Sequence, residues 1–268
     1  HLVGIEYSMG AHAYDVFRGQ GDCILLYKLR HAAFVRTSSA SAEKRLLELG
    51  VEKEKLKLIY RGLSKWHSSR PEGSFQSPVE ILSVGRLVEK KGYFEQLAIY
   101  HALNEAGIPF QAKIAGGGPL QEALKTECNR LGLEKKVLFL GPLPEDMTFE
   151  LYPEADLFFF TGKIAVNGDR DGLPNVIPEA MSAGVIVISS SAGGAAEALD
   201  EGATGFIRDP GNPLDWVKLI EHLFASPDEV INMRKAAEEA ARRLFDVTRT
   251  AKELGSCLLE ASRTCPKN

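Results

Sequence analysis

The sequence has little cysteine, no long apolar run and no excess of positive charge. Its four cysteines stand far apart, at positions 23, 128, 257 and 265, and form no CxxC pair. This spacing argues against a zinc site and against a disulfide framework, and it favours a reducing cytoplasm. No segment approaches the roughly 20 apolar residues that cross a bilayer. Peripheral membrane contact is compatible with the sequence, although no basic amphipathic helix requires it.

The charge balance excludes another class of protein. The net charge is -4, whereas nucleic-acid-binding proteins usually carry a basic excess, so no nucleic-acid partner is expected. A hydrophobic content of 44% and a charged content of 25% are ordinary for a globular chain that buries a core.

Short β-branched runs alternate with longer amphipathic segments in the larger part of the chain. Near-continuous apolar strands separated by helices are typical of a parallel sheet covered on both faces, which predicts an α/β fold with a doubly wound sheet. Ligands of such sheets bind at the carboxyl ends of the strands. The predicted strands cover residues 79–84, 110–115, 137–140, 156–160, 185–188 and 205–207, and the predicted helices between them cover 92–106, 119–131, 147–152, 174–183 and 195–199.

The chain is predicted to have three parts. Residues 78–243 form the doubly wound domain, and residues 244–268 form a helical tail that is able to cross back to the N-terminal part. Residues 1–77 contain two predicted strands, at 33–37 and 56–60, followed by a linker that includes residues 70–74. Because two strands make no stable domain, and because the first residue is His1 rather than Met, we expect this part to be the remnant of an α/β domain.

A glycine-bounded turn with cations directly follows the first strand of the doubly wound domain. Its sequence from Gly85 to Gly92 is GRLVEKKG. A turn that ends a strand and opens a helix offers backbone N–H groups and a positive dipole end to an anion. Arg86 adds a bidentate fork and Lys91 a point charge, and both suit phosphate. The alternative is a solvated turn with surface cations.

A second candidate element follows the fourth strand of this domain. It has the sequence DGLPNVIPE, in which Asp171 and Glu179 are separated by seven residues. Gly172 allows close approach of the backbone to a ligand, and a proline suits the first turn of a helix. Glu179 is able to accept hydrogen bonds from a ribose diol. Backbone groups that face a phosphate or sugar oxygen are expected around Leu173, Pro174, Asn175 and Val176. The alternative is an acidic helix start that complements the helix dipole.

Two further patterns bear on cofactors. The GGG turn that includes Gly116 and Gly117 allows close backbone approach, but residue 121 is Gln, so the GxGxxG spacing of dinucleotide enzymes is missing. This disfavours an NAD-linked oxidoreductase. Asp169-Arg170-Asp171 spells DxD, whose oxygens suit a hard cation. No metal is expected, because Arg170 separates the two acids and nearby cations already provide positive charge for a diphosphate.

The ordered motifs together resemble family 4 of the retaining glycosyltransferases, which have the GT-B fold. The resemblance runs from about residue 8 to the C-terminus, and several motifs occur in family-like order. They are the GRLVEKKG turn, IAGGGP at 114–119, FLG at 139–141, the acidic-x7-Glu element with PEAMSAG, and the AGGAAEAL and TGF segments. The resemblance implies that 78–243 is a Rossmann-like nucleotide-sugar donor-binding domain and that 1–77 belongs to the acceptor-side domain.

The resemblance also implies roles for single residues. Arg86 and Lys91 would hold the donor diphosphate and stabilise the leaving nucleotide, and Glu179 would bind the ribose hydroxyls. Asp171 takes the place of the family's first Glu, which contacts donor-sugar hydroxyls. Its shorter side chain is a departure, as is Thr161-Gly162 where Pro-Ser is common. His12, in AHAYD, resembles a histidine of the acceptor-side domain that lies in the cleft near the sugar, although a structural histidine would fit as well.

The expected function is transfer of a sugar from a nucleoside diphosphate, with UDP-sugar as the expected donor, to an acceptor hydroxyl with retention of configuration. The predicted donor-binding positions include Gly85, Gly116 and Gly117, and no separate cofactor or metal is expected. AHAYD resembles transferases of polysaccharide assembly, which implies a glycan or lipid-linked acceptor. The alternative is a nucleotide-binding module or fragment without catalytic activity.

Overall fold

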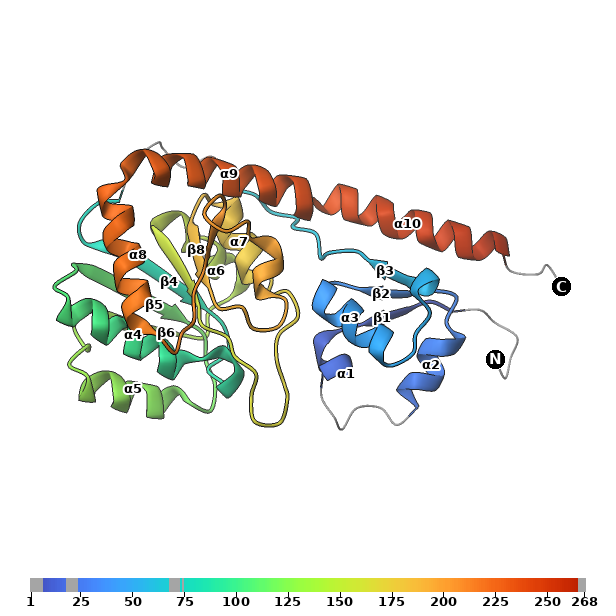
Figure 1. The fold of residues 1–268 in the computed structure, drawn as a ribbon, viewed down its shortest axis with the longest axis horizontal. Helices are drawn as coiled ribbons and strands as arrows, with labels where there is room; N and C mark the ends of the chain where they lie inside the picture. Colours follow the sequence, from blue (N-terminus) through green and yellow to red (C-terminus); the bar gives the residue numbers. More distant parts are fainter. Residues whose placement is uncertain (1–6, 18–23, 68–72, 74, 265–268) are drawn as a thin grey trace.

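The computed structural model describes residues 7–17, 24–67, 73 and 75–264, and it contains two parallel sheets (Figure 1). The predicted linker falls mostly on residues 68–72 and 74, which lie outside the described residues. The larger sheet has six strands in the order β6-β5-β4-β7-β8-β9, and the smaller has three in the order β1-β2-β3. Every strand pair within the two sheets is parallel, so the predicted α/β class is confirmed.

The larger sheet is doubly wound, as the sequence predicts. The chain starts at the centre with β4, builds outward through β5 and β6, and then returns to the other side of β4 with β7. The reversal of strand order between β4 and β7 is the point where doubly wound sheets bind ligands. The strands are β4 (Val79–Val84), β5 (Phe110–Ala115), β6 (Val137–Gly141), β7 (Leu157–Phe160), β8 (Ile186–Ser189) and β9 (Gly205–Ile207).

Helices cover both faces of this sheet. They are the 3-10 turn η2 (Glu89–Lys91), α4 (Tyr93–Glu105), α5 (Gln121–Arg130), α6 (Glu145–Phe149), η3 (Tyr152–Glu154), α7 (Val176–Ser182), η4 (Ala195–Ala198), α8 (Pro213–Ala225) and α9 (Pro227–Phe245). Helix α7 begins at Val176, two residues after the predicted start, and the loop before it therefore includes Pro174.

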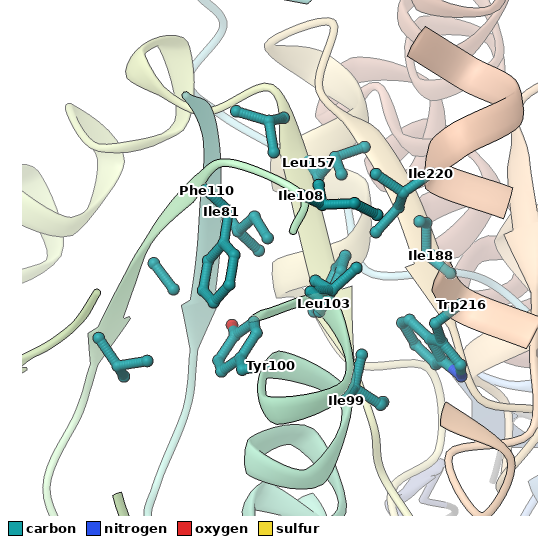
Figure 2. Packing of buried hydrophobic residues seen from close by; sticks show 14 of the residues in the cluster. Ile81, Ile99, Tyr100, Leu103, Ile108, Phe110, Leu157, Ile188, Trp216 and Ile220 are labelled. Atoms are coloured by element: carbon teal, nitrogen blue, oxygen red, sulfur yellow. The ribbon is translucent and has the colours of Figure 1, made fainter. Parts of the chain in front are cut away.

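Strand side chains alternate between two separate cores. In β7, Leu157 and Phe159 join one core while Phe158 and Phe160 join the other, because successive side chains of a strand point to opposite faces. Figure 2 shows the first core, in which Tyr100 of α4 and Trp216 of α8 pack over the strands. The second core includes residues of α7 and α9.

A buried ion pair ties α9 to the edge of the second core. Arg234 Nη2 lies 2.7 Å from Asp156 Oδ1, and the two side chains are only 8% and 7% exposed. Asp156 Oδ2 also accepts a hydrogen bond from the Glu80 N–H at 3.1 Å. The pair therefore links α9, the start of β7 and the neighbouring strand β4.

The N-terminal part is a smaller unit with one core of its own. Its sheet has a third strand that the sequence pattern does not predict, because Met9-Gly10-Ala11 contains no β-branched residue. The elements are β1 (Met9–Ala11), α1 (Ala13–Phe17), α2 (Leu25–His31), β2 (Val35–Thr37), α3 (Ala40–Glu48), the 3-10 turn η1 (Lys53–Lys55) and β3 (Leu56–Leu58).

The last helix, α10 (Val247–Thr264), extends from α9 past the N-terminal unit (Figure 1). The junction between α9 and α10 contacts the segment that leaves β3. The Leu63 N–H donates to the Phe245 carbonyl at 2.6 Å, and the Val247 N–H donates to the Leu63 carbonyl at 3.3 Å. None of the helices in the described part of the chain has the length and apolar character that crossing a membrane requires.

Candidate active site

The loops after β4 and β7 meet at the carboxyl end of the sheet. Gly92 ends the first loop in a left-handed conformation, with φ of 68°, and a Cβ at this position would overlap the Thr161 carbonyl. The Thr161 hydroxyl donates to the Gly92 carbonyl at 2.9 Å. Gly92 is therefore required for this close approach, which brings the Lys90-Lys91 pair next to the loop that carries the predicted acids.

Two lysines and two aspartates form a compact cluster between these loops. Lys91 Nζ lies 2.8 Å from Asp171 Oδ2, and Lys90 Nζ lies 3.3 Å from Asp171 Oδ1 and 3.1 Å from Asp169 Oδ1. All four side chains are between 11% and 18% exposed. Both carboxylates of the DxD sequence are thus paired with ammonium groups inside the protein.

A cavity of about 380 Å³ lies beside this cluster, between the two parts of the chain. It brings together several of the residues predicted from the sequence, namely His12, Lys91, Asp171, Leu173, Pro174, Asn175 and Val176. The remaining lining residues include Tyr14, Ser38 and Gly172, and two arginines that the sequence motifs do not include, Arg36 and Arg61.

Glu179 lines a second, neighbouring cavity of about 170 Å³. The Tyr152 hydroxyl donates to Glu179 Oε2 at 2.6 Å, which fixes one carboxylate oxygen. Burial raises the pKa of Glu179, and the Tyr152 hydrogen bond and the positive charge of Arg61 oppose this shift. Arg61 and Asn175 line both cavities, so the two spaces share a wall.

The predicted cation pair is only partly brought together. Lys91 lines the larger cavity, whereas Arg86 is exposed and lines neither cavity. Gly85, Gly116 and Gly117 also line neither cavity. Gly116 has φ of 143°, and a Cβ there would overlap the Gly85 carbonyl, so these glycines allow the β4 and β5 turns to pack closely.

Arg36 and Arg61 are not among the predicted site residues, because both lie in the N-terminal part, outside the sequence motifs. Arg36 Nε and Nη2 donate to the carbonyls of Ile59 and Tyr60 at 3.1 and 3.2 Å. Burial lowers the pKa of Arg36, and the positive charge of Arg61 lowers it further. The sequence signals that point to these residues are an arginine inside the short strand β2 and a second arginine shortly after β3.

A carboxylate of the larger domain contacts the N-terminal unit directly. Glu197 Oε2 accepts a hydrogen bond from the Ala40 N–H at 2.6 Å, and Glu197 Oε1 accepts one from the Ser41 N–H at 2.7 Å. These amides belong to the first turn of α3, where a negative charge is favoured by the helix dipole. The AGGAAEAL motif thus contributes an interdomain contact next to the larger cavity.

The family model of the glycosyl transferases group 1 matches residues 64–244, which is more than half of the chain. The chain belongs to this family. This group 1 chain is 31% identical over 219 residues to the putative colanic acid biosynthesis glycosyltransferase WcaL of Escherichia coli, covering 80% of the chain and 53% of the relative. It is 27% identical over 205 residues to the amylovoran biosynthesis glycosyltransferase AmsK of Erwinia amylovora, covering 76% of the chain and 50% of that protein.

Solved structures share this fold along nearly the whole chain. The crystal structure of HepE from Anabaena in complex with UDP matches with a TM-score of 0.79 at 21% identity, covering 97% of the group 1 chain and 73% of HepE. Its complex with UDP-glucose matches with a TM-score of 0.77 at 22% identity, covering 95% and 72%. The expected GT-B architecture is therefore confirmed. The chain spans about half the length of the bacterial relatives WcaL and AmsK.

Proposed function

We propose that this chain binds a nucleoside-diphosphate sugar and transfers the sugar to an acceptor hydroxyl. The observation that carries the proposal is the pair of cavities with a common wall, one lined by Lys91 and Asp171 and the other by Glu179. A nucleotide sugar presents a ribose diol, a diphosphate and a sugar in sequence. One cavity offers a hydrogen-bond acceptor, Glu179, and the adjoining cavity offers a cation and a second carboxylate.

The ribose is assigned to Glu179 and the diphosphate to Lys91. A carboxylate held by Tyr152 at 2.6 Å presents its remaining oxygen to a diol in a fixed direction. UDP is the proposed nucleotide, supported by the UDP and UDP-glucose complexes of HepE, a protein of the same fold. Arg86 enters the proposal as a second phosphate ligand on the resemblance alone.

The barrier to transfer lies largely in breaking the bond to the diphosphate, where negative charge grows. Lys91 provides a preorganised positive charge there, and such groups act most strongly on charge that develops in the transition state. Asp171 and His12 line the same cavity as Lys91 and are assigned to the sugar. Retention of configuration is proposed from the family resemblance.

We propose that no metal or separate cofactor takes part. Asp169 and Asp171 would be the acids of a DxD metal site, but each is within 3.3 Å of a lysine ammonium. A divalent cation would have to displace these ammonium groups, and Lys91 already supplies positive charge for the diphosphate.

The proposed acceptor is a glycan or a lipid-linked saccharide. WcaL and AmsK are named as transferases of colanic acid and amylovoran biosynthesis, which supports a role in polysaccharide or glycoconjugate assembly. Because the chain spans about half of these relatives, a test must separate donor binding from transfer.

The test combines calorimetric titration with UDP and a UDP-release assay with UDP-sugars, with and without saccharide acceptors. We expect UDP to bind, and EDTA to leave both binding and release unchanged. Binding without release under any condition would favour the alternative of a nucleotide-binding module. Failure to bind UDP, GDP or ADP would contradict the proposed function itself.

A further inference from the structure

Arg61 stands at the boundary between the two cavities. It follows β3 (Leu56–Leu58) and lines both the cavity that contains Glu179 and the cavity that contains Lys91. Asn175, which belongs to the six-stranded domain, also lines both cavities. The position of Arg61 therefore differs from that of Lys91 or Glu179, each of which borders one cavity.

The backbone next to Arg61 is held by long-range packing. A Cβ on Gly62 would overlap Thr250 Oγ1 and the Cα of Val247, so α10 packs directly on this backbone. The following residue, Leu63, exchanges backbone hydrogen bonds with Phe245 and Val247 at the α9–α10 junction. The C-terminal helices thus fix the point from which the Arg61 side chain extends.

The guanidinium of Arg61 is available to a ligand. Among the residues that the structure describes, no hydrogen bond or ion pair joins its side chain, which is exposed. Lys91, by contrast, is paired with Asp171 at 2.8 Å, and Arg36 donates to two carbonyls. The charge of Arg61 nevertheless acts on groups of both cavities. It opposes the rise that burial causes in the pKa of Glu179, and it lowers the pKa of Arg36.

We propose that Arg61 is a further donor-binding residue that contacts the diphosphate of the nucleotide sugar. This inference rests on the proposed function and deepens it. In a nucleotide sugar the diphosphate connects the ribose to the sugar, so a group shared by the Glu179 cavity and the Lys91 cavity meets the diphosphate. A guanidinium suits this position because its planar fork donates two parallel hydrogen bonds to phosphate oxygens.

A competing role for Arg61 is to act only on Glu179 through its charge. The two roles predict different ligand dependence. A phosphate contact strengthens binding of UDP and not of uridine, whereas an effect through Glu179 changes ribose recognition and therefore acts on both ligands equally.

The experiment measures the affinities of UDP and uridine by calorimetry for the wild-type chain, Arg61→Gln, Arg61→Lys and the control Arg45→Gln. Arg45 is an exposed arginine paired with Glu48 on α3, outside both cavities. We expect Arg61→Gln to weaken UDP binding about tenfold and to leave uridine binding unchanged. Arg61→Lys should recover part of the loss, because an ammonium keeps the charge without the fork. Arg45→Gln should match wild type.

Three results would overturn the inference about Arg61. The first is an unchanged UDP affinity in Arg61→Gln, and the second is an equal loss of affinity for UDP and uridine in that variant. The third applies if Arg61→Gln loses the folded circular dichroism spectrum, and it is full UDP affinity in both Arg61→Lys and a folded Arg61→Met. A wild-type chain that binds none of UDP, GDP and ADP would instead contradict the proposed function, so the two failures are distinguishable.

Discussion

The two parts of the chain contribute opposite kinds of groups to the shared cavity wall. The six-stranded domain supplies the acids Asp171 and Glu179 together with Lys91, whose charge is already paired with Asp171. The three-stranded unit supplies Arg36 and Arg61, and the side chain of Arg61 has no partner among the described residues. Among the cations that line the two cavities, the one without a partner in the described part of the chain therefore comes from the smaller part, outside the sequence motifs.

The two parts also differ in how their folds are held. The larger domain has two cores on opposite faces of its sheet and the buried pair Arg234–Asp156, whereas the smaller unit has one core. The smaller unit depends more on contacts with the rest of the chain, including the Glu197 carboxylate on α3 and the packing of Gly62 against α10. Variants of Asp156, Lys91, Glu179 and Glu197 test these differences, and the largest effect is expected for Asp156.

The buried ion pair should dominate the stability of the larger domain. Replacing Asp156 by alanine removes the carboxylate that Arg234 contacts inside the protein, which should lower the free energy of unfolding by about 3–5 kcal/mol. Denaturant titration measures this change. The control Glu253→Ala breaks the pair with Arg249, whose side chains are 46% and 40% exposed, and should cost at most about 1 kcal/mol. Equal losses in the two variants would contradict the special role of the buried pair.

Lys91 should matter for ligand binding rather than for folding. Lys91→Ala removes the ammonium beside Asp171 in the larger cavity and should weaken UDP binding by about 2–3 kcal/mol, or roughly 100-fold. Titration calorimetry measures the affinity, and circular dichroism confirms the fold. Lys218 is exposed on α8, so Lys218→Ala serves as the control and should bind UDP as wild type does. Wild-type affinity in Lys91→Ala would remove Lys91 from the site.

Donor binding should depend on pH through Glu179. Its pKa is raised above 4.5 by burial, and the ionised form is the stronger acceptor for ribose hydroxyls. As pH falls through the raised pKa, the affinity advantage of wild type over Glu179→Gln should therefore shrink from about tenfold to none. The ratio of the two affinities cancels the titration of the UDP phosphate. A ratio that does not change between pH 4 and 8 would contradict the assignment.

The raised pKa of Glu179 also affects stability, and this effect has the opposite pH dependence to that of donor binding. A carboxyl group with a raised pKa in the folded state binds more protons there than in the unfolded chain, between 4.5 and the folded pKa. The protonated carboxyl of Glu179 therefore stabilises the folded state fully below pH 4.5, and this stabilisation is lost as the pH rises through the folded pKa. Glu179→Gln should remove this dependence.

The contact between the two parts should show a local effect. Glu197→Ala removes the acceptor of the Ala40 and Ser41 N–H groups, and hydrogen exchange at these amides should accelerate about tenfold, which corresponds to about 1.4 kcal/mol. Exchange in β4 to β9 should stay unchanged. Glu201→Ala is the matched control, since Glu201 accepts from the Ile207 N–H within the larger domain. Unchanged exchange at Ala40 and Ser41 would contradict the role of Glu197.

The sequence predicts the central strands and the motif residues well, and for a physical reason. Residues 79–84 and 110–115 are apolar runs bounded by turn residues, and the structure places β4 and β5 at these positions. Lys91 and Glu179 follow strands of one sheet, so their approach to a common edge is set by the topology. The assigned roles of these residues stay predictions until a ligand is bound.

The remaining features depend on contacts that local patterns do not encode. Strand β1 has only three residues and no β-branched side chain, so it forms only through pairing with β2. The position of Arg61 depends on Gly62 and Leu63 packing against helices almost two hundred residues later in the chain. The Arg86 side chain is exposed and lines neither cavity, so its role as a phosphate ligand stays a prediction.

A crystal structure of this chain with bound UDP tests the shared-wall arrangement most directly. We expect ribose hydroxyls within hydrogen-bond distance of Glu179 and the diphosphate beside Lys91 and Arg61, in one continuous density across both cavities. UDP bound at another edge of the sheet, or touching Lys91 while Glu179 faces only protein, would contradict it.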